Sequence, residues 1–326
     1  MLFNIATYLE KNTPEELDED DNRVFDQDNE HEWDPEDITL SNHLHLAAFA
    51  QVNYFEMADV LTSGHFPNAP KPHWTFSTAT STFHFALKPS LWLSIDDAAA
   101  KFNLSNLPLA LYEYRHCVEG PSPHTVLEAR SYTEAHNLPF EHIQIWCKIH
   151  IQQMCYHDKT PDAPQTLQVI PPFTDNPYGL YDAVIVNTTS QSSWPKQGLD
   201  SRSLSNLYSL LLTHIGHSIV QLQMIFHPLH SDNMIAYVQC FDVIPQCGLP
   251  THPKTSMHLL QHAVQPDGSH IGDIIPVTLI QSPAHLIPNF GDCAHNHLTS
   301  QSGYELLLEF WLNKYWSKEF YYSLSL

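Results

Sequence analysis

The 24 prolines of this 326-residue chain include clusters that no regular helix can cross. Proline lacks a backbone N–H and its ring clashes with the preceding helical turn, so each cluster ends any helix before it. The main clusters span Pro67–Pro72, Pro121–Pro123 and Pro161–Pro177. We therefore expect short elements: a helical region with Pro-rich connectors over 39–160, a linker at 161–180, and a second region over 181–326.

An acidic segment precedes the first proline cluster. Residues 1–38 hold 14 acidic residues against Lys11 and Arg23, a net charge of −12, whereas the other 288 residues carry −10. Such a composition buries too little apolar surface to fold, so we expect a disordered acidic arm. The arm is interpreted as a solvated tail or a contact for a basic partner, with Trp33 as the anchor.

Composition excludes several classes of protein. A formal charge of −22 argues against non-specific nucleic-acid binding, which needs Lys and Arg to neutralise phosphates. The ten glycines form no dinucleotide fingerprint, P-loop or nucleophile elbow. The six cysteines form no C-x-x-C pair, and acids follow the short apolar start, where a signal peptide would have a cleavage site. We expect an intracellular protein with free thiols, in the nucleus or the cytosol.

The run from Ser203 to Ser231 lacks Asp, Glu, Lys and Arg and is long enough to span a bilayer. Its several His and Gln residues, and the polar–apolar alternation of its second half, favour a soluble helix and strand. We expect no membrane interaction.

The apolar spacing predicts five helices. Ser94 and Asp97 are typical of a capping box, and Pro108 suits a first helical position. The last helix carries Phe310, Trp311, Tyr315, Trp316 and Phe320. The predicted spans are Leu40–Leu61, Ser94–Phe102, Pro108–Arg115, Glu141–Tyr156 and Ser302–Tyr322.

Between 181 and 279 the pattern changes to short β-like runs separated by polar turns. The Thr-rich segment 74–88 also alternates. The fold class is therefore predicted as α+β: a small helical region, then a β-rich barrel-like domain closed by a C-terminal helix. The predicted strands of that domain are Tyr181–Asn187, Ser218–His227, Met234–Ile244, Met257–Val264 and Asp273–Leu279.

Several blocks in one order carry a family resemblance from Phe76 to Leu326. They are FSTATSTFHFALKPSLWLSIDDAAAKFNLSNLPLAL (76–111), QIWCKIHIQQMCYHD (144–158), AYVQCFDVIP (236–245), DIIPVTLIQSPAHLIPNFG (273–291) and SGYELLLEFWLNKYWSKEFYYSLSL (302–326). The chain resembles the C-terminal part, of unknown function, of Plavaka-type transposon proteins of basidiomycete fungi. In that family a zinc-finger region and a nuclease core with acidic metal ligands lie upstream, so the resemblance implies transposon origin without transposase activity.

One segment departs from the family pattern, which passes almost directly from a W-P-K-x-G-L turn to G-H-S. Here sixteen residues, 200–215, separate Leu199 from Gly216. We interpret 200–215 as an inserted loop or as non-coding sequence read through.

Histidine and cysteine raise the question of a metal site, because the chain has 23 His. With so many, close pairs arise by chance, and zinc sites normally use two separated ligand pairs. We expect no metal. The ligand groups considered are Cys293, His295 and His297; His43 and His45; His214 and His217; and His227 and His230.

Carboxylates raise the question of nuclease chemistry, which needs two or three acids around paired cations. Asp182, Asp242 and Glu305 are the candidates, but an acid that opens a buried strand, as Asp182 does, is commonplace. We expect no catalytic residue, no cofactor and no enzyme activity.

Two binding folds remain open alternatives. The two short helices at 94–115 have the spacing of a helix-turn-helix, but their net charge is −1, with Lys101 and Arg115 as the only bases. The later strands are similar in pattern to bromo-adjacent-homology-like barrels, which is fold analogy alone. We predict a transposon-derived accessory or remnant protein that is an interaction or scaffold domain, with a transposase core or another protein as partner. The alternative is a nucleic-acid-binding or chromatin-associated module.

Overall fold

The computed structural model describes most of the chain beyond residue 52. The described residues are 53–62, 75–119, 138, 140–155, 159–187, 217–229, 233–246, 249, 251–264, 268, 270–290, 303–317 and 320–321. They belong to one compact unit, Ala48–Leu326. The acidic arm with Trp33, the first part of the predicted helix Leu40–Leu61, and the 200–215 segment lie outside them.

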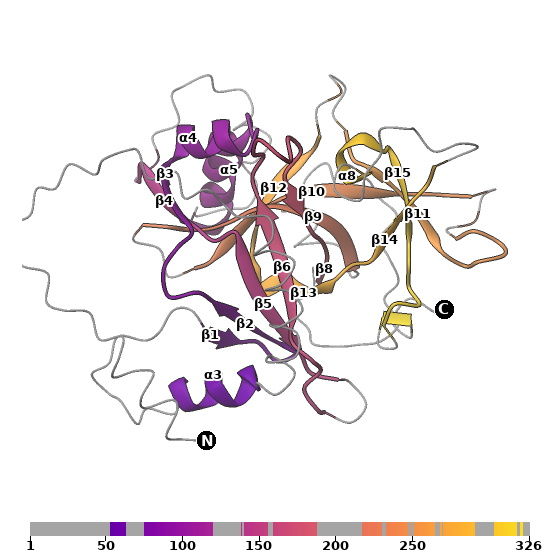
Figure 1. Cartoon of the computed structure of the whole chain (residues 1–326), viewed down its shortest axis with the longest axis horizontal. Helices are drawn as coiled ribbons and strands as arrows, with labels where there is room; N and C mark the ends of the chain where they lie inside the picture. Colours follow the sequence, from indigo (N-terminus) through magenta and orange to yellow (C-terminus); the bar gives the residue numbers. More distant parts are fainter. Residues whose placement is uncertain are drawn as a thin grey trace, which may run out of the picture. The chain divides into compact units, whose positions relative to one another are not determined.

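A five-stranded antiparallel sheet, in the order β1-β2-β5-β6-β7, forms the first layer (Figure 1). Phe83 and Phe85 of β2, opposite Ile151 and Ile149 of β5, point into the core. This bears out the extended structure expected at 74–88. The strands are β1 Thr75–Ser77, β2 Ser81–Phe85, β5 Lys148–Gln153, β6 Gln165–Ile170 and β7 Leu180–Tyr181.

A ten-stranded antiparallel sheet forms the second layer, with β13-β8-β9-β10-β11-β15-β14 as its main path. Strand β12 pairs with β10, and β4 joins β9 to β3. The strands predicted between 181 and 279 are confirmed at β8, β9, β10, β11 and β12. The bounds are β3 Leu91–Ser94, β4 His142–Ile145, β8 Ala183–Asn187, β9 His217–Pro228, β10 Ile235–Ile244, β11 His258–His262, β12 Gly272–Pro276, β13 Ile280–Pro283, β14 Leu286–Pro288 and β15 Glu309–Leu312.

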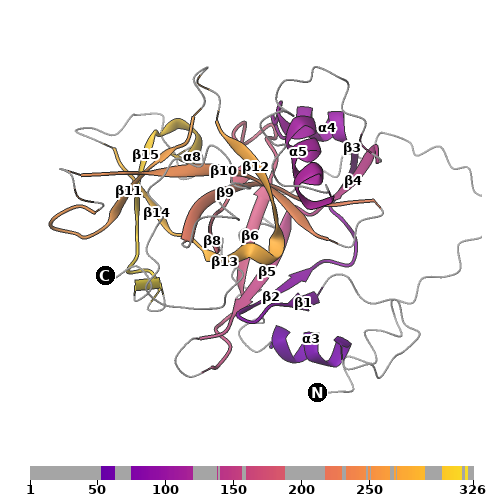
Figure 2. The same ribbon diagram turned by 180° about the vertical axis from the view of Figure 1, so that it is seen from behind.

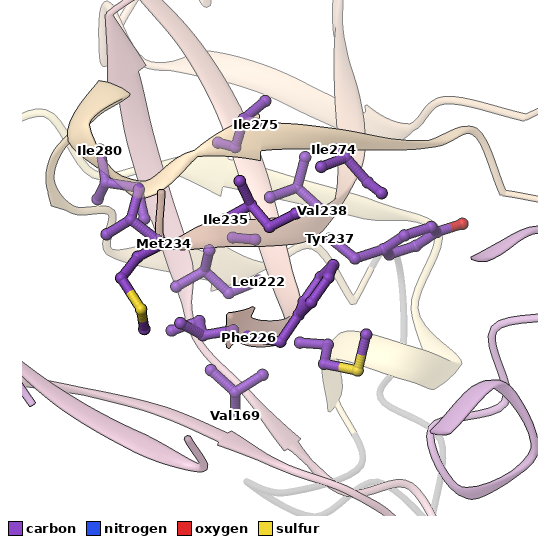
Figure 3. Packing of buried hydrophobic residues seen from close by; sticks show 14 of the residues in the cluster. Val169, Leu222, Phe226, Met234, Ile235, Tyr237, Val238, Ile274, Ile275 and Ile280 are labelled. Atoms are coloured by element: carbon purple, nitrogen blue, oxygen red, sulfur yellow. The ribbon is translucent and has the colours of Figure 1, made fainter. Parts of the chain in front are cut away.

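The main core lies between the two sheets. Val169 of β6 points toward Leu222 and Phe226 of β9, and residues of β10 and β12 complete the cluster (Figure 3). Almost all of β9 is buried, including its polar residues His217, Ser218, Gln221 and Gln223. A second, smaller cluster on the ten-stranded sheet includes Phe241, Phe310 and Leu312.

Helices α4 (Ile95–Lys101) and α5 (Leu107–Glu119) cover one end of the core, where α5 packs against β12 (Figure 2). Ser94 caps α4 as predicted, because its hydroxyl accepts from the Asp97 N–H at 3.1 Å. Helix α3 (Tyr54–Thr62) packs against β1 and β2 and matches the end of the predicted helix Leu40–Leu61.

The helix predicted at Glu141–Tyr156 is wrong: this segment forms β4 and β5. Ile143 and Ile145 are fully buried in β4, and Ile149 and Ile151 are fully buried in β5. This alternation of β-branched residues decides for strands over the helical spacing of Ile145, Trp146 and Ile149. The region 39–160 therefore holds strands as well as helices.

The segment predicted as a linker, 161–180, contains strand β6 and half of β7. Leu167 and Val169 of β6 are fully buried. The prolines stand on both sides of β6 rather than within it, so they bound the strand and leave its ladder intact. A connector rich in proline can thus enclose a core strand.

The C-terminal helix predicted over Ser302–Tyr322 is also wrong. Only α8 (Gly303–Leu306) is helical at its start, and β15 follows between β11 and β14. Phe310 and Leu312 point inward and Trp311 outward, the alternation of a strand. The structure is α+β and β-rich, and the described strands form no closed barrel. No helix in the described part of the chain is long and apolar enough to cross a membrane.

Candidate functional site

A tight turn after β15 carries an exposed group of aromatic side chains. The Asn313 N–H donates to the His285 carbonyl at 2.9 Å, and the Trp316 N–H donates to the Asn313 carbonyl at 3.2 Å. The Asn313 amide also contacts His285 Nδ1 at 3.1 Å. These bonds fix the turn next to β14, and the side chains of Tyr315 and Trp316 are exposed on it.

The exposed rings on this turn are held in place. Trp316 is 58% exposed, yet it stacks on His285 with ring centroids 4.6 Å apart and planes 7° apart. Tyr315 is 56% exposed, and its hydroxyl donates to the Thr255 carbonyl at 2.8 Å. Tyr321 packs near Tyr315, with centroids 5.5 Å apart. Rigid exposed aromatics of this kind are typical of binding surfaces, because they lose little conformational entropy on binding.

Lys314 lies beside two of these rings, those of Tyr315 and Tyr321, and is only 6% exposed. Its ammonium nitrogen stands 5.6 Å from the Tyr315 ring centroid and 5.4 Å from that of Tyr321. The negative faces of both rings stabilise the cation. We call Lys314, Tyr315, Trp316, Tyr321 and His285 the Lys314 surface.

A neutral imidazole lies beneath the Lys314 surface. His258 of β11 is buried, and its Nδ1 has no hydrogen-bond partner among the described residues. Burial and the nearby Lys314 charge lower the pKa of His258 to about 4. His258 is therefore uncharged at neutral pH and adds no positive charge beside Lys314.

Further apolar side chains are exposed on β14 and on the segments that flank β14 and β15. Ile287 pairs directly with Trp311 across the β14–β15 ladder. In both ribbon views, β11, β14, β15 and α8 gather in the same part of the unit. The exposed residues there are Ile287, Phe290, Leu306 and Leu308.

A buried polar network lies under α8 on the same sheet. Gln223 Nε2 and His270 Nδ1 both contact Gln239 Oε1, at 3.2 and 3.0 Å. His270 stacks on His262 with centroids 4.5 Å apart, and His262 Nε2 contacts the Tyr304 carbonyl at 3.1 Å. Burial lowers the pKa of His262 to about 4 and also lowers that of His270. The network contains amides and neutral imidazoles, so it can fix the packing of α8 but offers no charged nucleophile.

Asp182, the strongest sequence candidate for catalysis, joins strands. Its carboxylate Oδ2 accepts from the Gln168 N–H at 2.7 Å, which links β6 to the start of β8. Burial raises the pKa of Asp182 to about 6, an effect that the Gln168 hydrogen bond partly offsets. Its environment is explained by this structural contact.

The described side chains of Asp182 and Asp242 do not belong to a group of metal ligands. Asp242 lies on β10 opposite Gln261 of β11, and Glu305 lies on α8 with its side chain outside the described part. Within the described residues there is no group of three or more His, Cys, Asp and Glu side chains that could hold a metal ion.

Most of the histidine and cysteine candidates cannot be placed. His217 is buried at the start of β9, where burial lowers its pKa to about 4, and His227 is partly buried near the end of the same strand. The remaining candidates lie outside the described residues: His43, His45, His214, His230, Cys293, His295 and His297.

The helix-turn-helix candidate at 94–115 is part of the core. Leu107, Ala110 and Leu111 of α5 are buried, and α5 packs against β12. The exposed residues near its start include Asp96 and Asp97 as well as Lys101. A recognition helix needs a free basic face, and the packed α5 does not present one in its described residues.

Sequence reasoning missed the Lys314 surface, because it treated the C-terminal aromatics as one helical stripe. The signal was present: Phe310 and Leu312 alternate with Trp311, and Asn313 then opens a turn. That change of period separates the buried Phe310 and Leu312 from the exposed Tyr315 and Trp316.

A protein family defined as a domain of unknown function, DUF6830, matches residues 55–260. The chain belongs to this family. The match runs from α3 into β11, so the DUF6830 segment contains both faces of the main core but ends before β12 and the Lys314 surface. No curated protein and no solved structure gave a significant match to the chain.

Proposed function

We propose that this DUF6830 protein is a transposon-derived accessory protein that acts as an interaction or scaffold domain without catalysis of its own. The observation that supports the proposal most strongly is the Lys314 surface, where two aromatic rings are more than half exposed and yet held by stacking and hydrogen bonds. Exposed rings of this kind add little to the stability of the fold, whereas they suit a partner contact.

The partner in this proposal is a transposase core, because the chain resembles the C-terminal part of Plavaka-type transposon proteins. The proposal places the complex in the nucleus or the cytosol. The DNA upstream of the gene tests the origin: a reading frame for a nuclease core, with terminal inverted repeats around both, is expected. An upstream region without either would contradict transposon origin.

Co-purification tests the interaction. The tagged chain and the nuclease core of the same element are expressed together, and retention of the core is measured for wild type, Trp316→Ala and Trp92→Ala. Trp92 on β3 is 53% exposed and is a matched control. We expect Trp316→Ala alone to lose the core. Equal retention by all three proteins would contradict a contact through this surface.

The rival function is a nucleic-acid-binding module, for which the two-helix element with Lys101 and Arg115 was the predicted contact. Binding of labelled DNA and RNA is measured across a salt series. A linear fall of log affinity with log salt, lost in Lys101→Ala or Arg115→Ala, would favour that module over our proposal. We expect no binding at low salt, and no Mg²⁺- or Mn²⁺-dependent nicking by the purified protein.

A further inference from the structure

The side chain of Lys314 is mostly buried, and its ammonium group has no anionic partner among the described residues. Lys314 is 6% exposed, and no described carboxylate forms an ion pair with it. The two tyrosine rings stabilise the cation, but they carry no negative charge that would neutralise it. The ammonium group is therefore open to pairing with an incoming anion.

The described charged residues near Lys314 in the sequence or the sheet do not already neutralise it, so an incoming anion is still favoured. Lys254 is exposed in the 252–256 turn, whose Thr255 carbonyl accepts the Tyr315 hydroxyl. Glu309 on β15 is engaged by the Asn289 amide, which donates to its Oε2 at 2.8 Å. The described charges beside the rings are thus two lysines and one carboxylate that already has a partner.

The side chains beside Lys314 define what else the ligand must carry. Trp316 presents the ring face that His285 does not cover, and Tyr315 presents an exposed ring. We propose that the Lys314 surface binds a partner segment in which one Asp or Glu stands beside a large apolar side chain. The carboxylate binds the Lys314 ammonium, and the apolar side chain packs on Trp316. This inference rests on the proposed function and names the chemistry of its partner.

A carboxylate explains the site better than a nucleic-acid phosphate does. A strand of phosphates needs a row of cations along its length, but the described residues here offer only Lys314 and Lys254. A segment with a single carboxylate needs one cation and gains the rest of its affinity from apolar contact. Its low charge also limits repulsion by the acidic chain, since charges further away than about 8 Å are screened at physiological salt.

Titration with two capped peptides tests the inference. One peptide carries a Glu beside a Trp and a Leu, and the other has Gln in place of the Glu. Binding to the full chain is followed through the amide and indole N–H signals of ¹⁵N-labelled protein. We expect the Glu peptide to shift the Trp316 indole and to bind roughly tenfold more tightly than the Gln peptide, as for a charge-assisted hydrogen bond in a partly desolvated site.

Three variants separate the role of the charge from that of the fold. Lys314→Met keeps the aliphatic stem and is expected to bind both peptides with the same Kd. Lys314→Arg keeps the charge and the preference, and Lys88→Met removes an exposed lysine from the 86–90 turn without effect. Each variant is first checked by its urea unfolding curve.

The results also distinguish this inference from the proposed function. Equal affinity of wild type for the two peptides, or no shift of the Trp316 indole, would overturn the inference. The Trp316-dependent retention of the transposase core would stand in that case. If the peptides are discriminated but the core is not retained, the chemistry of the site stands and the transposase core is the wrong partner.

Discussion

Trp316 lies flat on His285, with ring centroids 4.6 Å apart and planes only 7° apart. His285 is also held by Asn313, whose amide contacts its Nδ1 at 3.1 Å. The ring of His285, which directly precedes β14, thus supports the most exposed tryptophan of the described chain, and the turn after β15 supports that ring in return. The contacts that order Trp316 therefore lie on the surface of the protein and outside its hydrophobic core.

We therefore predict that Trp316→Ala separates binding from stability. Its ring is 58% exposed, so truncation should lower the free energy of unfolding by less than about 1.5 kcal/mol, the scale of one aromatic stacking contact. Urea unfolding measures this effect, with Trp92→Ala as the control of matched exposure. A loss of several kcal/mol would mean that Trp316 is part of the core after all.

Gly272→Ala should destabilise the protein, because the ring of Tyr237 covers the α-carbon of Gly272. A Cβ at this position would lie 1.9 Å from the Tyr237 hydroxyl oxygen and 2.3 Å from the carbon that bears it. Since Tyr237 is buried among β9, β10 and β12, its ring cannot simply move away. We expect a loss of about 1–3 kcal/mol in the free energy of unfolding, as for overpacked cores.

Gly303→Ala is the control for that measurement, because its nearest heavy atom to a new Cβ is Pro288 Cγ at 3.9 Å. This variant should unfold like the wild type, to within about 0.5 kcal/mol. Equal losses in both variants would contradict a specific clash with Tyr237.

The strands between 181 and 279 could be read from the sequence because each is a short apolar run between polar turns. Helix α4 could also be predicted from a local signal, since Ser94 and Asp97 define its start within four residues. The two wrong helices were predicted in segments whose apolar residues fit both the period of a helix and the alternation of a strand. Ile145, Trp146 and Ile149 match a helix, but Ile143 and Ile145 match a strand, and only pairing with β9 and β3 decides between them.

The Lys314 surface is harder to foresee, because its parts come from distant positions. His285 and Thr255 meet Trp316 and Tyr315 only after β14 and β11 pair with β15. Burial of Lys314 depends on the same pairing. The local sequence pattern predicts the turn after Leu312. The residues that contact its side chains could be predicted only from the order of the strands in the sheet.

Stability should fall as the pH drops below 6.5. Burial holds the pKa of His84, His217, His258 and His262 at about 4 in the folded protein, against 6.5 for an ordinary histidine. Between these values the unfolded chain binds more protons, so acid favours unfolding. Each histidine adds a slope of up to about 1.4 kcal/mol per pH unit.

Urea unfolding between pH 4 and pH 8 measures this dependence. We expect His258→Gln to reduce the slope below pH 6.5, because it removes one of the four buried imidazoles. Unfolding curves that do not change from pH 7 to pH 5 would contradict the assignment of neutral buried histidines.

The buried carboxyl of Asp182 should affect stability in the opposite direction to the buried histidines, and Asp182→Asn tests this effect. Burial raises the pKa of the Asp182 carboxyl from 3.8 to about 6, so its favourable contribution is present below pH 3.8 and is lost as the pH rises through 6. Two pKa units correspond to up to about 3 kcal/mol. An asparagine keeps an oxygen that accepts from the Gln168 N–H without this charge penalty. The variant should therefore gain stability relative to wild type between pH 4 and pH 7, measured by urea unfolding at each pH. A difference that stays constant across this range would show that the carboxylate is not desolvated at the junction of β6 and β8.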